Sequence, residues 1–169
     1  WPEYSINYNW KPLADYLLFV EKKGTAVNIA SFVGATTLRV YVIGFDDRRA
    51  TAAEMKLMED LLRTEMAAGA LGLGSSLVYT PAFYADTDEL IRLARVAAEY
   101  NGMYISHIRN ESTDLLSAIR ELITISETAQ IPAEIYHFKT SGKENWGKQD
   151  SAIILLEEAR YRGLEITAD

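Results

Sequence analysis

The sequence predicts an α/β fold: a partial (β/α)8 barrel of the TIM type, with alternating parallel strands and helices and about five strands present. Apolar, β-prone runs alternate along the chain with segments of helical periodicity. Four predicted strands end at positions 74, 107, 137 and 169, in steps of 33, 30 and 32 residues. One βα unit of a barrel of ~250 residues takes roughly 31 residues. We therefore interpret residues 1–169 as a single domain fragment, the central part of a barrel.

The first fifty residues are predicted to hold one helix, one strand and one loop. The apolar spacing of Leu13–Val20 suits a helix that ends near Gly24. Val27–Val33 has the composition of a buried strand. Residues 40–50 have neither pattern, and we expect them to form a loop insertion.

Two helices in the middle of the chain begin with capping signals. Thr51 followed by Glu54 matches a capping box, and apolar residues then recur at helical spacing up to Gly69. The methionines in this stretch are most simply core residues. Asp86 caps the next helix, which Gly102 ends. Between the helices lie a strand over residues 69–74 and a long loop over residues 75–84, and such loops build the active sites of barrels.

The second half of the chain repeats the strand–helix unit. Met103–His107 is predicted to be a buried strand, and Ser112 opens the helix that follows it. Pro132 favours an extended entry into a strand that carries His137. A last helix begins at Asp150, and a last strand covers residues 164–169.

The composition excludes several classes of partner. The chain is 49% hydrophobic with a net charge of −7, which argues against nucleic acid and anionic membranes as partners. No apolar run approaches ~20 residues, the length that spans a bilayer. The chain has no cysteine, which excludes a disulfide framework and favours the cytoplasm. It opens on Trp1, and we expect it to be an internal piece of a longer protein.

The two histidines of the chain are the main functional signal. His107 and His137 each follow an apolar run, so both are expected at neighbouring strand ends facing one barrel mouth. Neutral imidazoles there can share a divalent ion such as zinc, and a catalytic zinc needs three protein ligands. The third would come from outside the chain or from a carboxylate such as Asp169. Burial in satisfied hydrogen bonds is the alternative, but two histidines at matching positions favour the metal.

Three charged residues lie beside the histidines in the sequence. Lys139 has two interpretations: it can anchor a substrate carboxylate, or it can simply be solvated at the rim. Arg109 and Glu111 are expected to form an ion pair that stiffens their loop.

Four motifs together resemble one enzyme family. They are Gly69–Pro81, Tyr104–Glu111, Glu134–Gly142 with Asn145–Gly147, and Ile166–Asp169. In this order and spacing they are similar to the N-acyl-D-amino-acid deacylase (D-aminoacylase) branch of the metal-dependent amidohydrolase superfamily. The resemblance extends from about Leu13 to the end of the chain.

This resemblance implies a zinc-dependent enzyme, with one or two divalent ions, that hydrolyses the amide of a small N-acyl amino acid. The family's name points to the D configuration, and the sequence leaves the stereochemistry open. His107 and His137 match the family's metal-ligand histidines. Lys139 and Tyr79 match positions that contact the substrate. The family's His-x-His pair, its bridging ligand and its catalytic aspartate have no counterpart in this chain, so we expect no catalytic residue here and an inactive fragment that self-associates through uncovered barrel surfaces.

Two departures from the family pattern concern the substrate. Gly34–Ala35 stands where many D-aminoacylases have Gly-His, and Gly74–Ser76 replaces the more usual Ser-Thr-Gly. Both indicate that the acyl group and the amino acid differ from those of D-aminoacylase.

Three alternatives remain open from the sequence. The enzyme can be another amidohydrolase of the dihydroorotase or hydantoinase type. It can be a barrel enzyme that uses Lys139 as a Schiff-base nucleophile. It can also be a non-catalytic scaffold that keeps the barrel.

Overall fold

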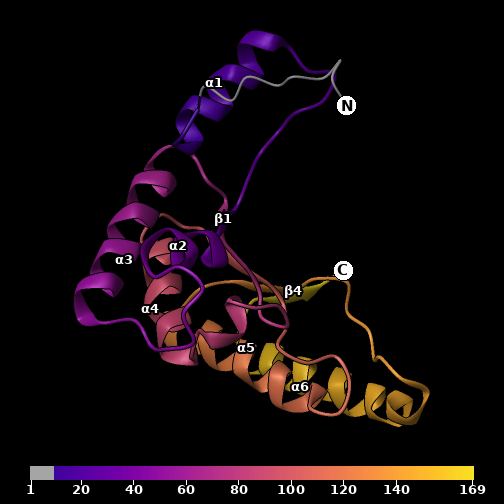
Figure 1. Cartoon of the computed structure of the whole chain (residues 1–169). Helices are drawn as coiled ribbons and strands as arrows, with labels where there is room; N and C mark the ends of the chain where they lie inside the picture. Colours follow the sequence, from indigo (N-terminus) through magenta and orange to yellow (C-terminus); the bar gives the residue numbers. More distant parts are fainter. Residues whose placement is uncertain (1–9) are drawn as a thin grey trace, which may run out of the picture.

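The computed structural model describes residues 10–169, and it shows a parallel sheet with helices packed on one face (Figure 1). Five strands follow one another in sequence order, and each is parallel to its neighbours. They are β1 (Val33–Gly34), β2 (Gly72–Ser76), β3 (Met103–His107), β4 (Ala133–Ile135) and β5 (Ile166–Ala168). This is the strand order of consecutive βα units in a (β/α)8 barrel, so the predicted fold class is confirmed.

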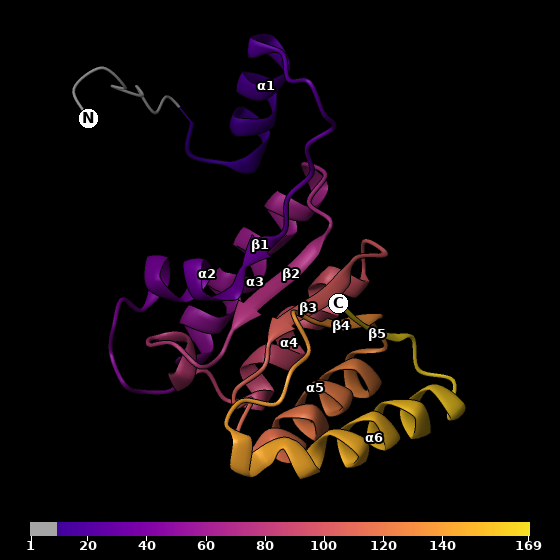
Figure 2. The same cartoon turned by 90° about the vertical axis from the view of Figure 1, so that its right-hand side faces the viewer.

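The helices alternate with the strands and form one layer. They are α1 (Leu13–Lys23), α2 (Ala35–Val42), α3 (Ala52–Ala67), α4 (Thr87–Ala98), α5 (Leu115–Ala129) and α6 (Gln149–Tyr161), with short 3₁₀ turns η2 (Ala82–Tyr84) and η3 (Lys143–Lys148). Helices α2 to α6 contact one another in sequence order, whereas α1 has no buried residue and stands apart from the layer (Figure 2). Among residues 10–169, no helix is long and apolar enough to cross a bilayer.

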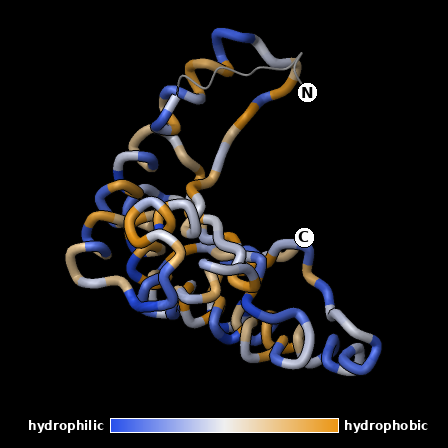
Figure 3. The backbone as a smooth tube through the Cα atoms, in the orientation of Figure 1, coloured by the Kyte–Doolittle hydropathy of each residue, from blue (hydrophilic) through white to orange (hydrophobic). Residues whose placement is uncertain are grey.

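The core lies between the sheet and this helix layer. Alternate strand residues such as Leu73, Tyr104 and Ile166 are buried against apolar helix residues. Hydrophobic and hydrophilic residues alternate along the helices (Figure 3), as expected where one helix face meets the core. The other strand residues, including Ser76 and His107, face the opposite side of the sheet, and the register pairs these two residues directly.

The predicted capping signals are confirmed. The Thr51 side chain accepts a hydrogen bond from the Glu54 amide, and the Glu54 carboxylate accepts one from the Thr51 amide. The Asp86 side chain accepts from the Glu89 amide at the start of α4. The predicted N-terminal helix is also present, and it ends at Gly24.

Two predictions for the first fifty residues are wrong. Val27–Val33 is not a buried strand, because only Val33 and Gly34 are in β1 and Val27 is 69% exposed. Residues 40–50 are not wholly a loop, because α2 begins directly after β1 and continues to Val42. The β-branched residues of α2 disfavour a helix intrinsically, but burial of Ala35 and Leu38 in the core outweighs this preference.

Several element boundaries also differ from the prediction. Strand β2 covers Gly72–Ser76 rather than residues 69–74, α6 begins at Gln149 rather than Asp150, and β5 covers Ile166–Ala168 rather than residues 164–169. Helix α5 begins at Leu115 rather than Ser112, because the Asn110 side chain accepts the amide protons of Ser112 and Asp114 and holds these residues in a turn. Strand β4 ends at Ile135, so His137 lies in the turn that follows it.

Candidate metal centre

The two histidines meet at the carboxyl ends of adjacent parallel strands. His107 is the last residue of β3, and its ring faces away from the helix layer. His137 lies two residues beyond β4, in a turn with a positive φ of 39°. Their ring centroids are 4.5 Å apart and the rings are nearly perpendicular, at 80°. The sequence expectation that both imidazoles face one end of the sheet therefore agrees with the structure.

Glu111 completes a group of three potential metal ligands with the histidines. One ligand atom from each of His107, Glu111 and His137 lies within 4.8 Å of the other two. The same carboxylate oxygen, Glu111 Oε1, is 3.5 Å from His107 Nε2 and 3.2 Å from His137 Nδ1. Two imidazoles and a carboxylate are ligands that zinc accepts.

Glu111 was not predicted to be part of this group. The predicted ion pair between Glu111 and Arg109 is wrong. Arg109 instead pairs with Glu121 on α5, with 2.9 Å between Arg109 Nε and Glu121 Oε2. The four-residue spacing between His107 and Glu111 was the available signal, but only the path of the loop after β3 shows that the two side chains meet.

Lys139 lies at the same group, as the proposed substrate-binding role requires. Its ammonium donates to Glu111 Oε1 at 2.6 Å and lies 2.8 Å from His137 Nδ1. A carboxylate oxygen and an imidazole nitrogen therefore already surround a cationic group in this structure. This shows that the donor set suits a cation.

Tyr79 lies beside His107. It belongs to the turn between β2 and η2, its side chain is exposed, and its ring centroid is 5.6 Å from that of His107. Of the four site residues predicted from the sequence, His107, His137 and Lys139 thus all lie at Glu111, and Tyr79 lies beside His107.

Desolvation affects the charge of His107. Only 15% of its side chain is exposed, and burial lowers the pKa of this imidazole below its ordinary value, against an opposing contribution from Glu111. Nearby His137 and Lys139 lower this pKa further. These effects favour the neutral form, which is the form that binds metal.

Asp169 supports the site through the backbone of His137. Its carboxylate accepts the His137 amide proton, and its own carbonyl accepts the Phe138 amide proton at 2.8 Å. These bonds hold the backbone of the turn that contains His137. The carboxylate of Asp169 is thus used in positioning His137, and Glu111 supplies the third donor of the group.

Comparisons with known proteins relate the chain to one group of enzymes. D-aminoacylase from Alcaligenes xylosoxydans xylosoxydans is 35% identical over 156 residues, which are 92% of this chain and 32% of that enzyme. The solved structure of N-acyl-D-glutamate deacylase from Bordetella bronchiseptica, complexed with zinc and a phosphonate inhibitor, is 32% identical and superposes with a TM-score of 0.89 over 94% of this chain and 33% of that one.

A solved D-aminoacylase, described as defining a novel subset of amidohydrolases, gives the same TM-score of 0.89 at 33% identity, over 94% of this chain and 33% of that one. No family model matches the chain. The chain thus spans about a third of the length of the relatives it matches. Over that third, both the sequence and the fold of this chain are similar to those of the D-aminoacylase group of amidohydrolases.

Proposed function

We propose that this chain provides the metal-binding strand ends of a zinc-dependent hydrolase that cleaves N-acyl D-amino acids to a carboxylate and a free amino acid. The observation that carries the proposal is the meeting of His107, Glu111 and His137 at the ends of β3 and β4. This group lies within the region that aligns with D-aminoacylase and with a zinc-containing deacylase. Both relatives are named for activity on N-acyl D-amino acids.

In this proposal His107 and His137 are metal ligands, with Glu111 as a further donor. A zinc ion held by these residues would supply polarisation of a scissile carbonyl and a lowered pKa for a metal-bound water. The protein's own contribution is to hold the donors in place: β3 fixes His107, and Asp169 fixes the backbone of His137. We assign no general base among the described residues.

We further propose that Lys139 and Tyr79 bind the substrate. Lys139 is 48% exposed and carries a positive charge next to the donor group, so it can attract the carboxylate of an N-acyl amino acid. Tyr79 presents an exposed ring and hydroxyl beside His107, where it can contact the acyl group or the reacting carbonyl. The departures at Gly34–Ala35 and Gly74–Ser76 support a substrate that differs from that of D-aminoacylase.

We also propose that the chain self-associates through its unpaired strand edges and that it is located in the cytoplasm. In the described part of the chain, β1 pairs only with β2 and β5 pairs only with β4, and unpaired strand edges favour association with other strands. We propose that residues 1–169 behave as one domain fragment with this tendency. The absence of cysteine supports a location in the cytoplasm.

Thermal melting with and without zinc tests the metal site. Zinc at about a hundred times its dissociation constant stabilises a protein by about 2.7 kcal/mol, so the melting temperature of the wild-type chain should rise. His107→Ala and His137→Ala should each remove most of this rise, whereas Glu157→Gln, on the exposed face of α6, should preserve it. An unchanged melting temperature in the wild type would reject the metal site.

Release of free amino acid tests the reaction in the full enzyme that contains this chain. N-acetyl derivatives of D- and L-amino acids with acidic, apolar and small side chains are the substrates to compare. Hydrolysis that favours D-amino acids and stops with a chelator supports the proposal. Covalent trapping of Lys139 by borohydride in the presence of a carbonyl substrate would instead indicate Schiff-base chemistry.

A further inference from the structure

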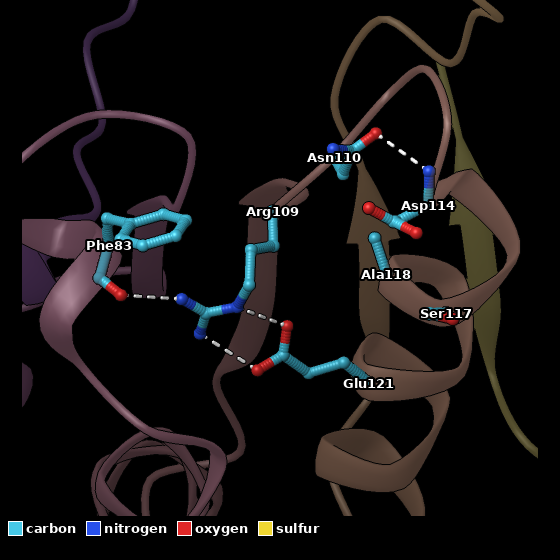
Figure 4. A pocket seen from close by; sticks show the side chains of 7 residues that line it. All are labelled: Phe83, Arg109, Asn110, Asp114, Ser117, Ala118 and Glu121. Atoms are coloured by element: carbon cyan, nitrogen blue, oxygen red, sulfur yellow. Dashed lines mark hydrogen bonds and ion pairs between the residues drawn. The ribbon is translucent and has the colours of Figure 1, made fainter.

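Arg109, two residues after His107, connects three separate parts of the fold. Its guanidinium makes four hydrogen bonds: two to the Glu121 carboxylate on α5, and one each to the carbonyl oxygens of Phe83 and Ala85. All four distances are 2.8 or 2.9 Å. Figure 4 shows the side chain extending from the end of β3 between the Phe83 backbone and Glu121. Its charge is thus balanced by Glu121.

The segment that Arg109 holds is the one that carries Tyr79. The Phe83 amide donates to the Tyr79 carbonyl oxygen at 2.8 Å, while the Phe83 carbonyl accepts from Arg109 at 2.8 Å. The guanidinium also lies 5.7 Å from the centroid of the Phe83 ring, within the range of cation–π attraction. The backbone of Phe83 therefore links Tyr79 to the Arg109 side chain, because its amide bonds to Tyr79 and its carbonyl oxygen bonds to Arg109.

These contacts connect the segment that carries Tyr79 to the candidate metal centre. The Tyr79 ring lies beside His107, the last residue of β3, and Arg109 follows His107 by two residues. The Tyr79 side chain is 62% exposed, so packing does not fix it and its position depends on its own backbone. Glu121, the carboxylate partner of Arg109, is itself held in place, because it also accepts a hydrogen bond at 2.8 Å from Thr87 at the start of α4.

We propose that Arg109 is a positioning residue, which with Glu121 holds residues 79–85 against the end of β3 and so keeps Tyr79 beside His107 for recognition of the substrate. The part that concerns the substrate rests on the function proposed above. Arg109 itself contacts neither the substrate nor the metal in this scheme. It acts through the backbone of Phe83 and Ala85.

The test compares single and double variants of the full enzyme that contains this chain. Arg109→Met keeps the apolar stem and removes all four hydrogen bonds, and it should lower kcat/KM roughly ten- to a hundredfold, the effect of a misplacement of about an ångström. The zinc dissociation constant should change less than about threefold. Arg92→Met is the matched control, since Arg92 forms an exposed pair with Glu59 between α3 and α4, and it should leave kcat/KM unchanged.

A double-mutant cycle separates positioning from general structural support. If Arg109 acts through Tyr79, adding Arg109→Met to Tyr79→Ala should cost little further activity. Effects that multiply fully in the double variant, or a loss of zinc affinity in Arg109→Met, would overturn the proposal.

Hydrogen exchange gives a result that does not depend on activity. The amides of residues 79–85, apart from Pro81, should exchange at least about tenfold faster in Arg109→Met than in the wild type or in Arg92→Met, since breaking the bonds of Arg109 favours local opening. An unchanged exchange rate would reject the role of Arg109 in holding residues 79–85. If the wild-type enzyme hydrolyses no N-acyl amino acid while exchange does accelerate in Arg109→Met, the proposed function fails, but the role of Arg109 in holding residues 79–85 is supported.

Discussion

At the scale of single residues, one carboxylate oxygen determines the electrostatics of the candidate metal centre. Glu111 Oε1 lies within 3.5 Å of polar atoms on His107, His137 and Lys139. Only 12% of the Glu111 side chain is exposed, so water screens these interactions weakly. Glu111 and Lys139 should therefore affect metal binding in opposite directions.

Glu111→Gln should weaken zinc binding. The amide keeps the shape of the carboxylate but removes the negative charge, and loss of a ligand or of a group that orients ligands typically costs about 10–100-fold in metal affinity. Competition with a chromophoric chelator measures the dissociation constant. Glu157→Gln, an exposed change on α6, is the control. Equal zinc affinity in wild type and Glu111→Gln would show that the carboxylate is not needed.

Lys139→Met should strengthen zinc binding while weakening substrate binding. The Lys139 ammonium lies 2.6 Å from Glu111 Oε1 and 2.8 Å from His137 Nδ1, so it competes with a metal ion for both atoms and repels it. Because Lys139 is half exposed, solvent reduces this repulsion, and we expect a rise in zinc affinity of about three- to tenfold. The same chelator competition measures it, with Lys143→Met in η3 as the control. A lower affinity in Lys139→Met would contradict this account.

At the scale of elements, the loop after β3 and the loop after β4 are tied to each other. The Ser141 amide donates to the Glu111 carbonyl at 2.7 Å. The Lys148 ammonium donates to the Thr113 carbonyl at 2.8 Å and to the side-chain oxygen of buried Asn145 at 2.7 Å. These bonds place the loop that carries Glu111 against the loop that carries His137.

Lys148→Met should therefore reduce both stability and metal affinity. Hydrogen bonds from a charged donor contribute about 1.5–3 kcal/mol, and we expect a loss of about 1–3 kcal/mol in the free energy of unfolding because Lys148 is only partly buried. Zinc affinity should fall severalfold as Glu111 loses its fixed position. Urea unfolding and zinc titration measure the two effects, with Lys143→Met again as the control. Loss of stability with unchanged zinc affinity would show that the bridge does not position Glu111.

At the scale of the whole molecule, a buried ion pair connects the first βα unit to the rest. Arg39 on α2 and Glu89 on α4 lie 2.7 Å apart, with 1% and 6% of their side chains exposed. Arg39 also donates to the carbonyl oxygens of Asp46 and Arg48. Burial raises the pKa of Glu89, and the positive charge of Arg39 opposes this rise.

Arg39→Met should destabilise the fold by about 3–5 kcal/mol at neutral pH, the usual cost of leaving a buried charge without its partner. Without Arg39 the pKa of Glu89 rises further above its value in the unfolded chain. The folded state then gains a proton at a higher pH than the unfolded state does, so the loss of stability should shrink as the pH falls from 7 to 5. Urea unfolding at both pH values measures this.

The Arg92→Met variant, which breaks the ion pair of the half-exposed Arg92 with Glu59, provides the comparison for that experiment. It should cost less stability than Arg39→Met at either pH, because water reaches the Arg92 side of the pair. The double variant Arg39→Met/Glu89→Leu should recover most of the lost stability, because no buried charge is then left unpaired. Equal destabilisation by Arg39→Met at pH 7 and pH 5 would show that an unpaired charge on Glu89 is not the cause of the lost stability.

The sequence by itself determined the fold class, the helix starts at Thr51 and Asp86, and the position of His107 at the end of a strand. Periodicity and capping are local properties, so they can be detected in neighbouring residues. Only the tertiary structure decided that Val27 is exposed, that residues 35–42 are helical, and that Glu111 meets the histidines while Arg109 turns to Glu121. These outcomes depend on contacts between residues distant in the sequence, where packing and charge pairing outweigh local preference.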